Sequence, residues 1–211
     1  MLTTKRFFVF IIGLLVLSFG IALSIRSGLG ISPVSSVSFV LSRIIGISVG
    51  NTTTAFYSFC VLLQLFILKK DFKLKHFLQV VFSFVFGKFT DLSLFITRAF
   101  ITEVYIFRVL MLFASLVIIA LGVYTVVLTD IVMIAPDGLV KAIADHWSLE
   151  FSQVKSTFDI ICVSISAILS LVFLGSIQGL REGTLILALS IGRLIGIISR
   201  NYKDMITALY I

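Results

Sequence analysis

Charged residues are scarce in this chain. Of its 211 residues, 13% are charged and 59% are apolar, whereas soluble domains average about 25% charged and 45–50% apolar. This balance excludes a disordered chain and a soluble nucleic-acid-binding protein. Two cysteines and two prolines exclude a disulfide scaffold and a collagen-like fibre. The composition predicts an integral membrane protein, so the expected partner is the lipid bilayer.

Enzyme signatures are also lacking. The sequence has no HExxH and no glycine-rich phosphate loop with a lysine, and its two histidines, His76 and His146, lie far apart. We therefore expect neither an enzyme, nor a metal site, nor a cofactor. Cys60 and Cys162 both lie in apolar stretches, so we expect them to be buried free thiols.

Long apolar runs are what the sequence has instead. A bilayer core about 30 Å thick needs roughly 20 apolar helical residues to cross it. Six segments meet this criterion: Phe7–Ile25, Val49–Leu68, Phe77–Ile96, Tyr105–Thr129, Val154–Leu174 and Gly183–Ser199.

The basic residues predict the orientation of these spans. With a cytoplasmic amino terminus, the segments on the cytoplasmic side hold Lys5, Arg6, Lys69, Lys70, Lys73, Lys75, Lys141, Lys155, Arg200 and Lys203. The outer segments hold Arg26, Arg43, Arg98, Arg108 and Arg181. Because lysine and arginine collect on the cytoplasmic side, both termini are expected there. The net charge of +7 is thus mainly an orientation signal.

The two halves of the chain resemble each other, with an offset of 102 to 105 positions. The alignment pairs Pro33 with Pro136, Cys60 with Cys162 and Lys88 with Arg193. These are the only prolines, the only cysteines and two intramembrane cations that each follow a glycine. We therefore expect a first repeat over residues 1–100 and a second over residues 101–211.

Each repeat contains three spans. An odd number of spans makes the second copy enter the membrane from the opposite side, so the repeats are inverted. The predicted fold is an all-α membrane protein with six transmembrane helices in two inverted three-helix repeats, each with a short broken or re-entrant helix.

The short helices follow glycine- and proline-rich breaks. Residues 34–47 and 139–147 are apolar but too short to span, and each begins near a proline, which is favoured at the start of a helix. Ser32 is a candidate cap before Pro33. If the two helices re-enter the membrane, their amino termini present free N–H groups to an anionic or carbonyl group. The alternative is a pair of amphipathic helices on the membrane surface.

Several segments resemble a known family. Gly20–Pro33, Ile134–Leu139, Lys155–Asp159, Leu180–Thr184 and Ile191–Gly192 look like the YczE/YyaS/YitT family of bacterial multi-pass membrane proteins. The similarity covers nearly the whole chain. The resemblance implies a bacterial cytoplasmic membrane location and a duplicated helical fold, and it implies little about the substrate.

Charged residues inside spans are functional candidates because they are costly in a membrane. Lys88 and Asp91 are three positions apart and are expected to pair. Arg193 is expected to pair with Asp159 or Asp130. A structural interpretation stays open, in which end charges reach the interface and one internal pair holds the bundle together; it is favoured for Arg26, Asp130 and Lys155.

These patterns predict a secondary transporter or exporter of a small, unidentified solute. The candidate substrate-binding residues are Arg26, Gly28, Gly30, Ser32, Pro33, Lys88, Asp91, Asp130, Pro136, Asp137, Gly138, Asp159 and Arg193. The alternative is an accessory or scaffold protein that assists another membrane complex or pathway without moving solute. A homodimer is compatible with so small a bundle. No nucleic-acid partner is expected.

Overall fold

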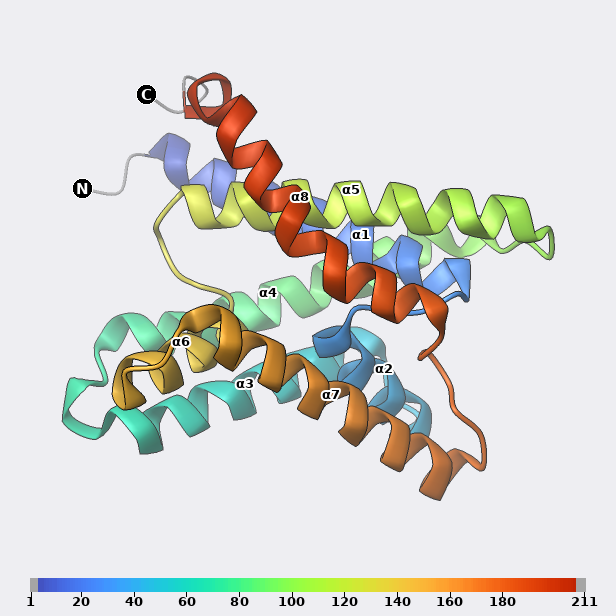
Figure 1. Ribbon diagram of the computed structural model, residues 1–211, viewed down its shortest axis with the longest axis horizontal. Coiled ribbons are helices and arrows are strands. Elements are labelled where there is room, and N and C mark those ends of the chain that lie inside the picture. The colour runs from blue at the N-terminus through green and yellow to red at the C-terminus, as the bar shows by residue number, and fades with distance from the viewer. Residues whose placement is uncertain (1–3, 208–211) are drawn as a thin grey trace. The chain divides into compact units, whose positions relative to one another are not determined.

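The computed structural model describes residues 4–207, and every regular element in this range is helical (Figure 1). The α-helices are α1 (Thr4–Ser27), α2 (Pro33–Ile45), α3 (Val49–Leu68), α4 (Leu74–Ile96), α5 (Tyr105–Leu128), α6 (Ala135–Trp147), α7 (Phe151–Leu174) and α8 (Glu182–Thr207). Short 3-10 turns, η1 (Lys69–Asp71) and η2 (Thr97–Phe100), follow α3 and α4.

The six predicted spans are confirmed as helices long and apolar enough to cross a bilayer. They are α1, α3, α4, α5, α7 and α8. The predicted bounds of α3 match those of the structure, and those of α1, α4, α5 and α7 differ by at most three residues at either end. Helix α8 continues eight residues beyond the predicted end at Ser199. The two short helices are also present, at α2 and α6. The all-helical membrane class is therefore confirmed, and the inverted relation of the halves stays a prediction.

The helices form two compact units that do not follow the order of the chain. The first unit comprises residues 4–32, 89–131 and 181–207, and the second comprises residues 33–88 and 132–180. Each unit therefore takes segments from both halves of the sequence, and α4 contributes to both units.

In the first unit, α1 and α5 pack side by side along their length, and α8 packs on α5 (Figure 1). Glycines allow this approach: a Cβ atom at Gly20 would lie 2.8 Å from the Ile119 amide nitrogen, and one at Gly122 would lie 2.6 Å from that of Leu17. Gly13 likewise meets Val126. Because residues later in α1 contact residues earlier in α5, the two helices run antiparallel.

In the second unit, the short helices pack against long helices of the other half. Helix α2 packs on α7 and on α3, while α6 packs on α3 and on α7. Small polar groups join these helices, as in the hydrogen bond between the hydroxyls of Ser36 and Ser166, 2.8 Å apart. Such small polar contacts are typical of helix packing in membranes.

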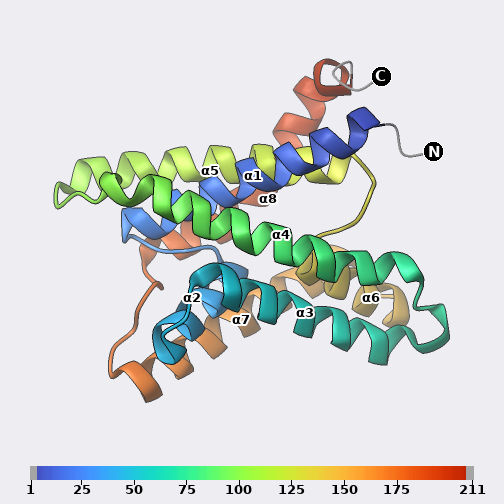
Figure 2. The same ribbon diagram turned by 180° about the vertical axis from the view of Figure 1, so that it is seen from behind.

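Large apolar side chains lie exposed along the long helices. Phe66 is 72% exposed on α3, Val172 is 69% exposed on α7, and Leu189 is 66% exposed on α8. In water such a surface would be costly, whereas lipid chains cover it without penalty. Figure 2 shows the same helices from behind.

Candidate functional site

The second break leads into α6, where the candidate site of the second unit begins. Ile134 has an extended backbone as the cap residue, and α6 begins at Ala135 with Pro136 inside its first turn. Proline is tolerated there because the first N–H groups of a helix have no intrahelical partner. Asp137 follows in the same turn, where the helix dipole favours a negative charge.

A single lysine holds two carboxylates beside this turn. The Lys155 ammonium nitrogen lies 3.0 Å from the Asp137 carboxylate and 3.1 Å from the Asp159 carboxylate. The three side chains are only 20–30% exposed. Lys155 and Asp159 share one face of α7 because they are four positions apart. The ion pairs therefore join the start of α6 to the first turns of α7 and leave one negative charge in excess.

Two buried glutamines line another face of the same turn. The Gln64 amide nitrogen donates to the Gln79 side-chain oxygen at 2.8 Å and to the Ala135 carbonyl at 3.0 Å. A Cβ atom at Gly138 would lie 2.9 Å from the Gln79 amide nitrogen and 3.1 Å from the Gln64 Oε1. A glycine at position 138 therefore allows close packing of the two glutamines on α6, and its backbone is helical.

Helix α3 contributes neutral polar groups next to the charges. Tyr57 is 4% exposed and stacks on Phe86 with ring centroids 5.6 Å apart. It lies within electrostatic range of Asp137 and of the thiols of Cys60 and Cys162. Both cysteines are buried and free, as predicted.

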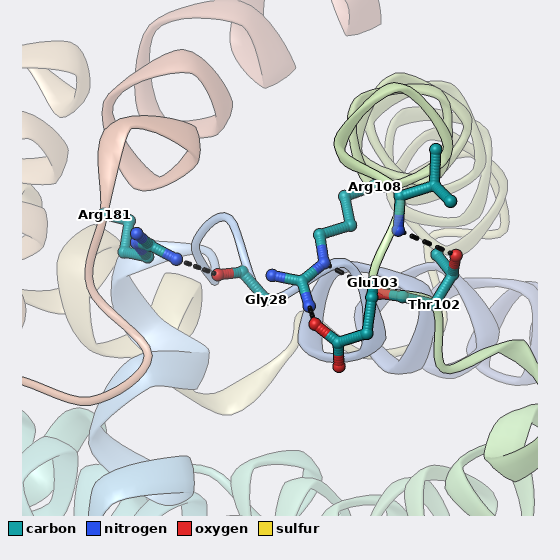
Figure 3. Close-up of polar contacts among 6 residues, drawn as sticks. Gly28, Thr102, Glu103, Arg108 and Arg181 are labelled. Carbon is teal, nitrogen blue, oxygen red and sulfur yellow. Dashed lines mark hydrogen bonds and ion pairs between the residues drawn. The ribbon is translucent and has the colours of Figure 1, made fainter.

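The first break, in the first unit, is held by its own hydrogen bonds. Gly28 and Gly30 have positive φ angles of 65° and 141°, which explains why glycine stands at both positions. The Gly28 carbonyl accepts a hydrogen bond from Arg181 at 3.3 Å (Figure 3). The Leu29 carbonyl accepts another, from the Gly183 amide at 2.8 Å. These backbone groups are satisfied by the start of α8.

Figure 3 also shows a second arginine of the first unit, Arg108 near the start of α5. Its guanidinium pairs with the Glu103 carboxylate at 2.8 Å and donates to the Thr102 carbonyl at 2.8 Å. Arg108 thereby fixes the connection that leads into α5.

Arg26 has a capping role. Its Nη2 donates to the Leu94 carbonyl at 2.7 Å, in the last turn of α4, where carbonyl groups lack intrahelical partners. Its Nε is buried without a hydrogen-bond partner. The structural interpretation favoured for Arg26 fits this geometry.

The remaining candidates lie apart from the lysine bridge. Lys88 is exposed, donates to the Asn51 side chain at 3.3 Å and stands 5.2 Å from the Phe84 ring centroid. Asp91 is half-buried on α4, and its pairing with Lys88 stays a prediction. Asp130 is exposed after α5 with a positive φ of 48°.

Asp159 pairs with Lys155 of its own helix, which lies one helical turn away and reaches the carboxylate directly. Arg193 lies exposed on α8 in the first unit, and its predicted pairing with Asp159 or Asp130 stays a prediction.

The structure separates the predicted site residues into two sets. The second unit contains Pro33, Lys88, Pro136, Asp137, Gly138 and Asp159, and the first contains Arg26, Gly28, Gly30, Ser32, Asp91, Asp130 and Arg193. Asp137 and Asp159 come together, with Pro136 and Gly138 in the same turn as Asp137.

Sequence reasoning missed three residues of this site: Lys155, Gln64 and Gln79. Lys155 resembles a charge at a helix end, although its spacing of four from Asp159 predicts an ion pair. The two glutamines are polar residues inside apolar runs, which is the signal that marks them as candidates in a membrane.

A family model described as a family of unknown function (DUF6198) matches residues 4–200, nearly the whole chain. No curated protein and no solved structure matches the chain.

Proposed function

We propose that this chain, which belongs to DUF6198, a family of unknown function, is a secondary transporter or exporter of a small solute. We place it in a bacterial cytoplasmic membrane with both termini in the cytoplasm. The observation that carries the proposal is a cluster of three charged side chains. Asp137 lies on the short helix α6, and Lys155 and Asp159 lie on α7, a candidate span. Partly buried charges in a membrane mark solute or ion pathways by default.

The fold of such a transporter is an inverted duplication, and the α1–α5 contact supports it. Leu17 and Gly20 correspond to Ile119 and Gly122 at an offset of 102 positions. The contact of Gly20 with Ile119 and that of Gly122 with Leu17 are therefore equivalent under exchange of the two halves. An antiparallel pair of equivalent helices is what a two-fold axis in the membrane plane produces.

A second pair of equivalent contacts lies in the second unit. At the same offset, Ser36 corresponds to Gly138 and Ser166 to Gln64. Ser36 and Ser166 share a hydrogen bond where α2 begins, and Gly138 packs on Gln64 where α6 begins. The starts of α2 and α6 are also 102 positions apart, so this register supports the duplication better than the offset of 103 that the prolines suggest.

The charges occur in one copy alone. At this offset Asp137, Lys155 and Asp159 correspond to Ser35, Thr53 and Tyr57. Neutral residues therefore suffice for the same helix contacts in the first copy. Because the shared fold does not require the charges, we assign them to the binding of a solute or an ion at the start of a re-entrant helix.

The two short helices are proposed to be re-entrant. Helix α2 buries Ser36, Ser38 and Val40, each 0% exposed, so it is covered by protein on more than one face. A surface helix would instead keep a broad polar face in water. Irregular backbone at membrane depth is tolerated where protein covers it or a wet cavity lines it.

Ligand-dependent thermal stabilisation tests the proposal. Small anions, amino acids and lipophilic compounds are screened on the purified protein, on Asp159→Asn and on Asp145→Asn. Asp145 is the matched control, because it lies on α6 with its carboxylate 63% exposed beside Lys141. We expect a compound that raises the Tm of the wild type and of Asp145→Asn but not of Asp159→Asn.

If no compound of these classes raises the Tm while Asp159→Asn lowers it, the cluster serves only to hold α6 against α7. That outcome favours the accessory or scaffold protein.

A further inference from the structure

The α3–α4 connection, residues 69–73, carries three lysines at the point where two candidate spans meet. Lys69, Lys70 and Lys73 are all exposed. Only residues 72–75 separate the candidate span of α3 from that of α4. Because both spans end here, the three ammonium groups lie at the level of the lipid headgroups.

No acidic side chain compensates these charges. Within the described part of the chain, none of the ion pairs includes one of the three lysines. The connection holds one acidic residue, Asp71, which is exposed as well. Three lysines against one aspartate leave the connection with a net charge of +2, which is available to a partner outside the chain.

The backbone at Lys69 shows that this lysine does not serve the fold. Lys69 ends α3 with a φ of 44° and a ψ of −105°, and its N–H donates to the Leu65 carbonyl. A positive φ is strained for a residue with a side chain. Helix α7, the counterpart of α3 in the proposed duplication, also ends at a residue with positive φ, and that residue is Gly175. The charge of Lys69 is therefore the property that its position leaves to be explained.

Aromatic packing gives the connection a defined shape. The Phe72 ring stacks on the His76 ring, with centroids 4.8 Å apart, and meets the Phe77 ring edge-on at 5.1 Å. The Lys73 N–H donates to the His76 Nδ1 at 2.9 Å. The lysines are thus presented by a turn with its own internal contacts.

Orientation of the spans accounts for the number of these lysines but not for their arrangement. An orientation signal needs only an excess of lysine and arginine in a loop, so it requires no lysine at a strained position. A phosphate group matches the arrangement better, because each ammonium offers three N–H donors. Near an anionic membrane surface, each lysine strengthens the attraction about fivefold.

We propose that Lys69, Lys70 and Lys73 bind the phosphate group of an anionic lipid, such as phosphatidylglycerol, in the leaflet next to the α3–α4 connection. The site goes beyond the transporter function proposed above and does not depend on it.

Thermal unfolding of the full-length protein in detergent tests the site, with phosphatidylglycerol and phosphatidylcholine of the same acyl chains titrated in parallel. Phosphatidylglycerol is expected to raise the Tm of the wild type more than phosphatidylcholine does, and less so at high salt. Combined substitution of the three lysines by glutamine is expected to raise the half-saturating phosphatidylglycerol concentration roughly 100-fold, at about fivefold for each lysine. Their combined substitution by arginine keeps the response. So does Lys141→Gln, the control at an exposed lysine that pairs with Asp145.

Lys69→Gly separates the charge from the backbone. Glycine relieves the strain at a positive φ, so this variant is expected to have a higher Tm than the wild type in phosphatidylcholine. It is also expected to bind phosphatidylglycerol about fivefold more weakly. A lower Tm of Lys69→Gly in phosphatidylcholine would show that Lys69 serves the fold and would contradict the proposal.

Inorganic phosphate, added at the concentration of the lipid phosphate, distinguishes a lipid headgroup from a free anion. An equal rise in Tm from inorganic phosphate alone overturns the proposal. Equal responses of the wild type to the two lipids overturn it as well, and so does a phosphatidylglycerol response that the glutamine variant keeps in full. Because the two lipids are compared on the wild type, the proposal can be refuted even if a variant does not fold.

Discussion

The Lys155 ammonium lies 3.0 Å from the Asp137 carboxylate and thereby joins the first turn of α6 to α7. Asp159, one turn further along α7, accepts from the same lysine at 3.1 Å. The packing of Val140 and Ala144 against Val154 joins the same two helices. The ion pair therefore adds to a contact that neutral side chains already make.

Removal of the lysine is predicted to destabilise the protein. Lys155→Met leaves Asp137 and Asp159 facing each other without a cation. Loss of one partner of a buried pair costs about 3–5 kcal/mol, and the partial exposure of these side chains reduces this to about 1–3 kcal/mol. Thermal unfolding in detergent measures the change as a lowered Tm.

Lys141→Met is the matched control for Lys155→Met. Lys141 also pairs with an aspartate four positions away, Asp145, but both side chains are more than half exposed. Its loss is expected to change stability by less than about 0.5 kcal/mol. Equal effects of the two substitutions would contradict the structural role of Lys155.

The α1–α5 contact predicts a second set of effects. Gly20→Ala and Gly122→Ala each bring a Cβ atom against the backbone of the facing helix, at 2.8 Å from Ile119 and 2.6 Å from Leu17. Overpacking of this kind costs about 1–3 kcal/mol. Gly192→Ala on α8 meets nothing within 4 Å and is expected to be neutral or slightly stabilising. Unchanged Tm values for Gly20→Ala and Gly122→Ala would refute the close approach.

Substitution of the two glycines of the first break, Gly28 and Gly30, is expected to destabilise the protein to different extents. Gly28→Ala puts a Cβ atom on a residue with a left-handed backbone conformation, where no other atom lies within 4 Å of it. The strain lowers the free energy of unfolding by about 1–2 kcal/mol. Gly30→Ala costs more, because its φ of 141° suits glycine alone and its Cβ would lie 2.4 Å from the Thr184 amide nitrogen. The comparison of purified yield and Tm of the two variants checks this order, and a more damaging Gly28→Ala would contradict it.

The orientation in the membrane is tested by cysteine labelling. Native Cys60 and Cys162 are 1% and 2% exposed, so background reaction is low. Lys73→Cys, between α3 and α4, is expected to react with an impermeant maleimide from the cytoplasmic side alone. Ile101→Cys, between α4 and α5, is expected to react from the outer side alone. The reverse pattern would place both termini outside.

Much of the fold can be predicted from the sequence, because hydropathy and helix length depend on local residues. The bounds of α3 and the start of α2 at Pro33 follow from an apolar run and a proline. The start of α6 is predicted less well, since Pro136 is its second residue and Ala135 its first. The pairing of α2 with α7 depends on contacts between distant segments, which periodicity does not reveal.

The site is predictable only in part, for the same reason. Asp137 and Asp159 stand out as charges near a break and inside a span. Their partner Lys155 resembles an ordinary helix-end charge until α6 and α7 are brought together. Gln64 and Gln79 are 15 positions apart on different helices, and only the folded arrangement shows that they meet at Gly138.

Transport itself is measured as solute flux in proteoliposomes, with the compound that stabilises the wild type most as the probe. A transporter shows saturable, ion-dependent uptake by the wild type and by Asp145→Asn, and at least a tenfold loss of uptake in Asp159→Asn, reconstituted to the same protein density. Uptake by the folded wild type no faster than in protein-free liposomes would contradict the transporter function.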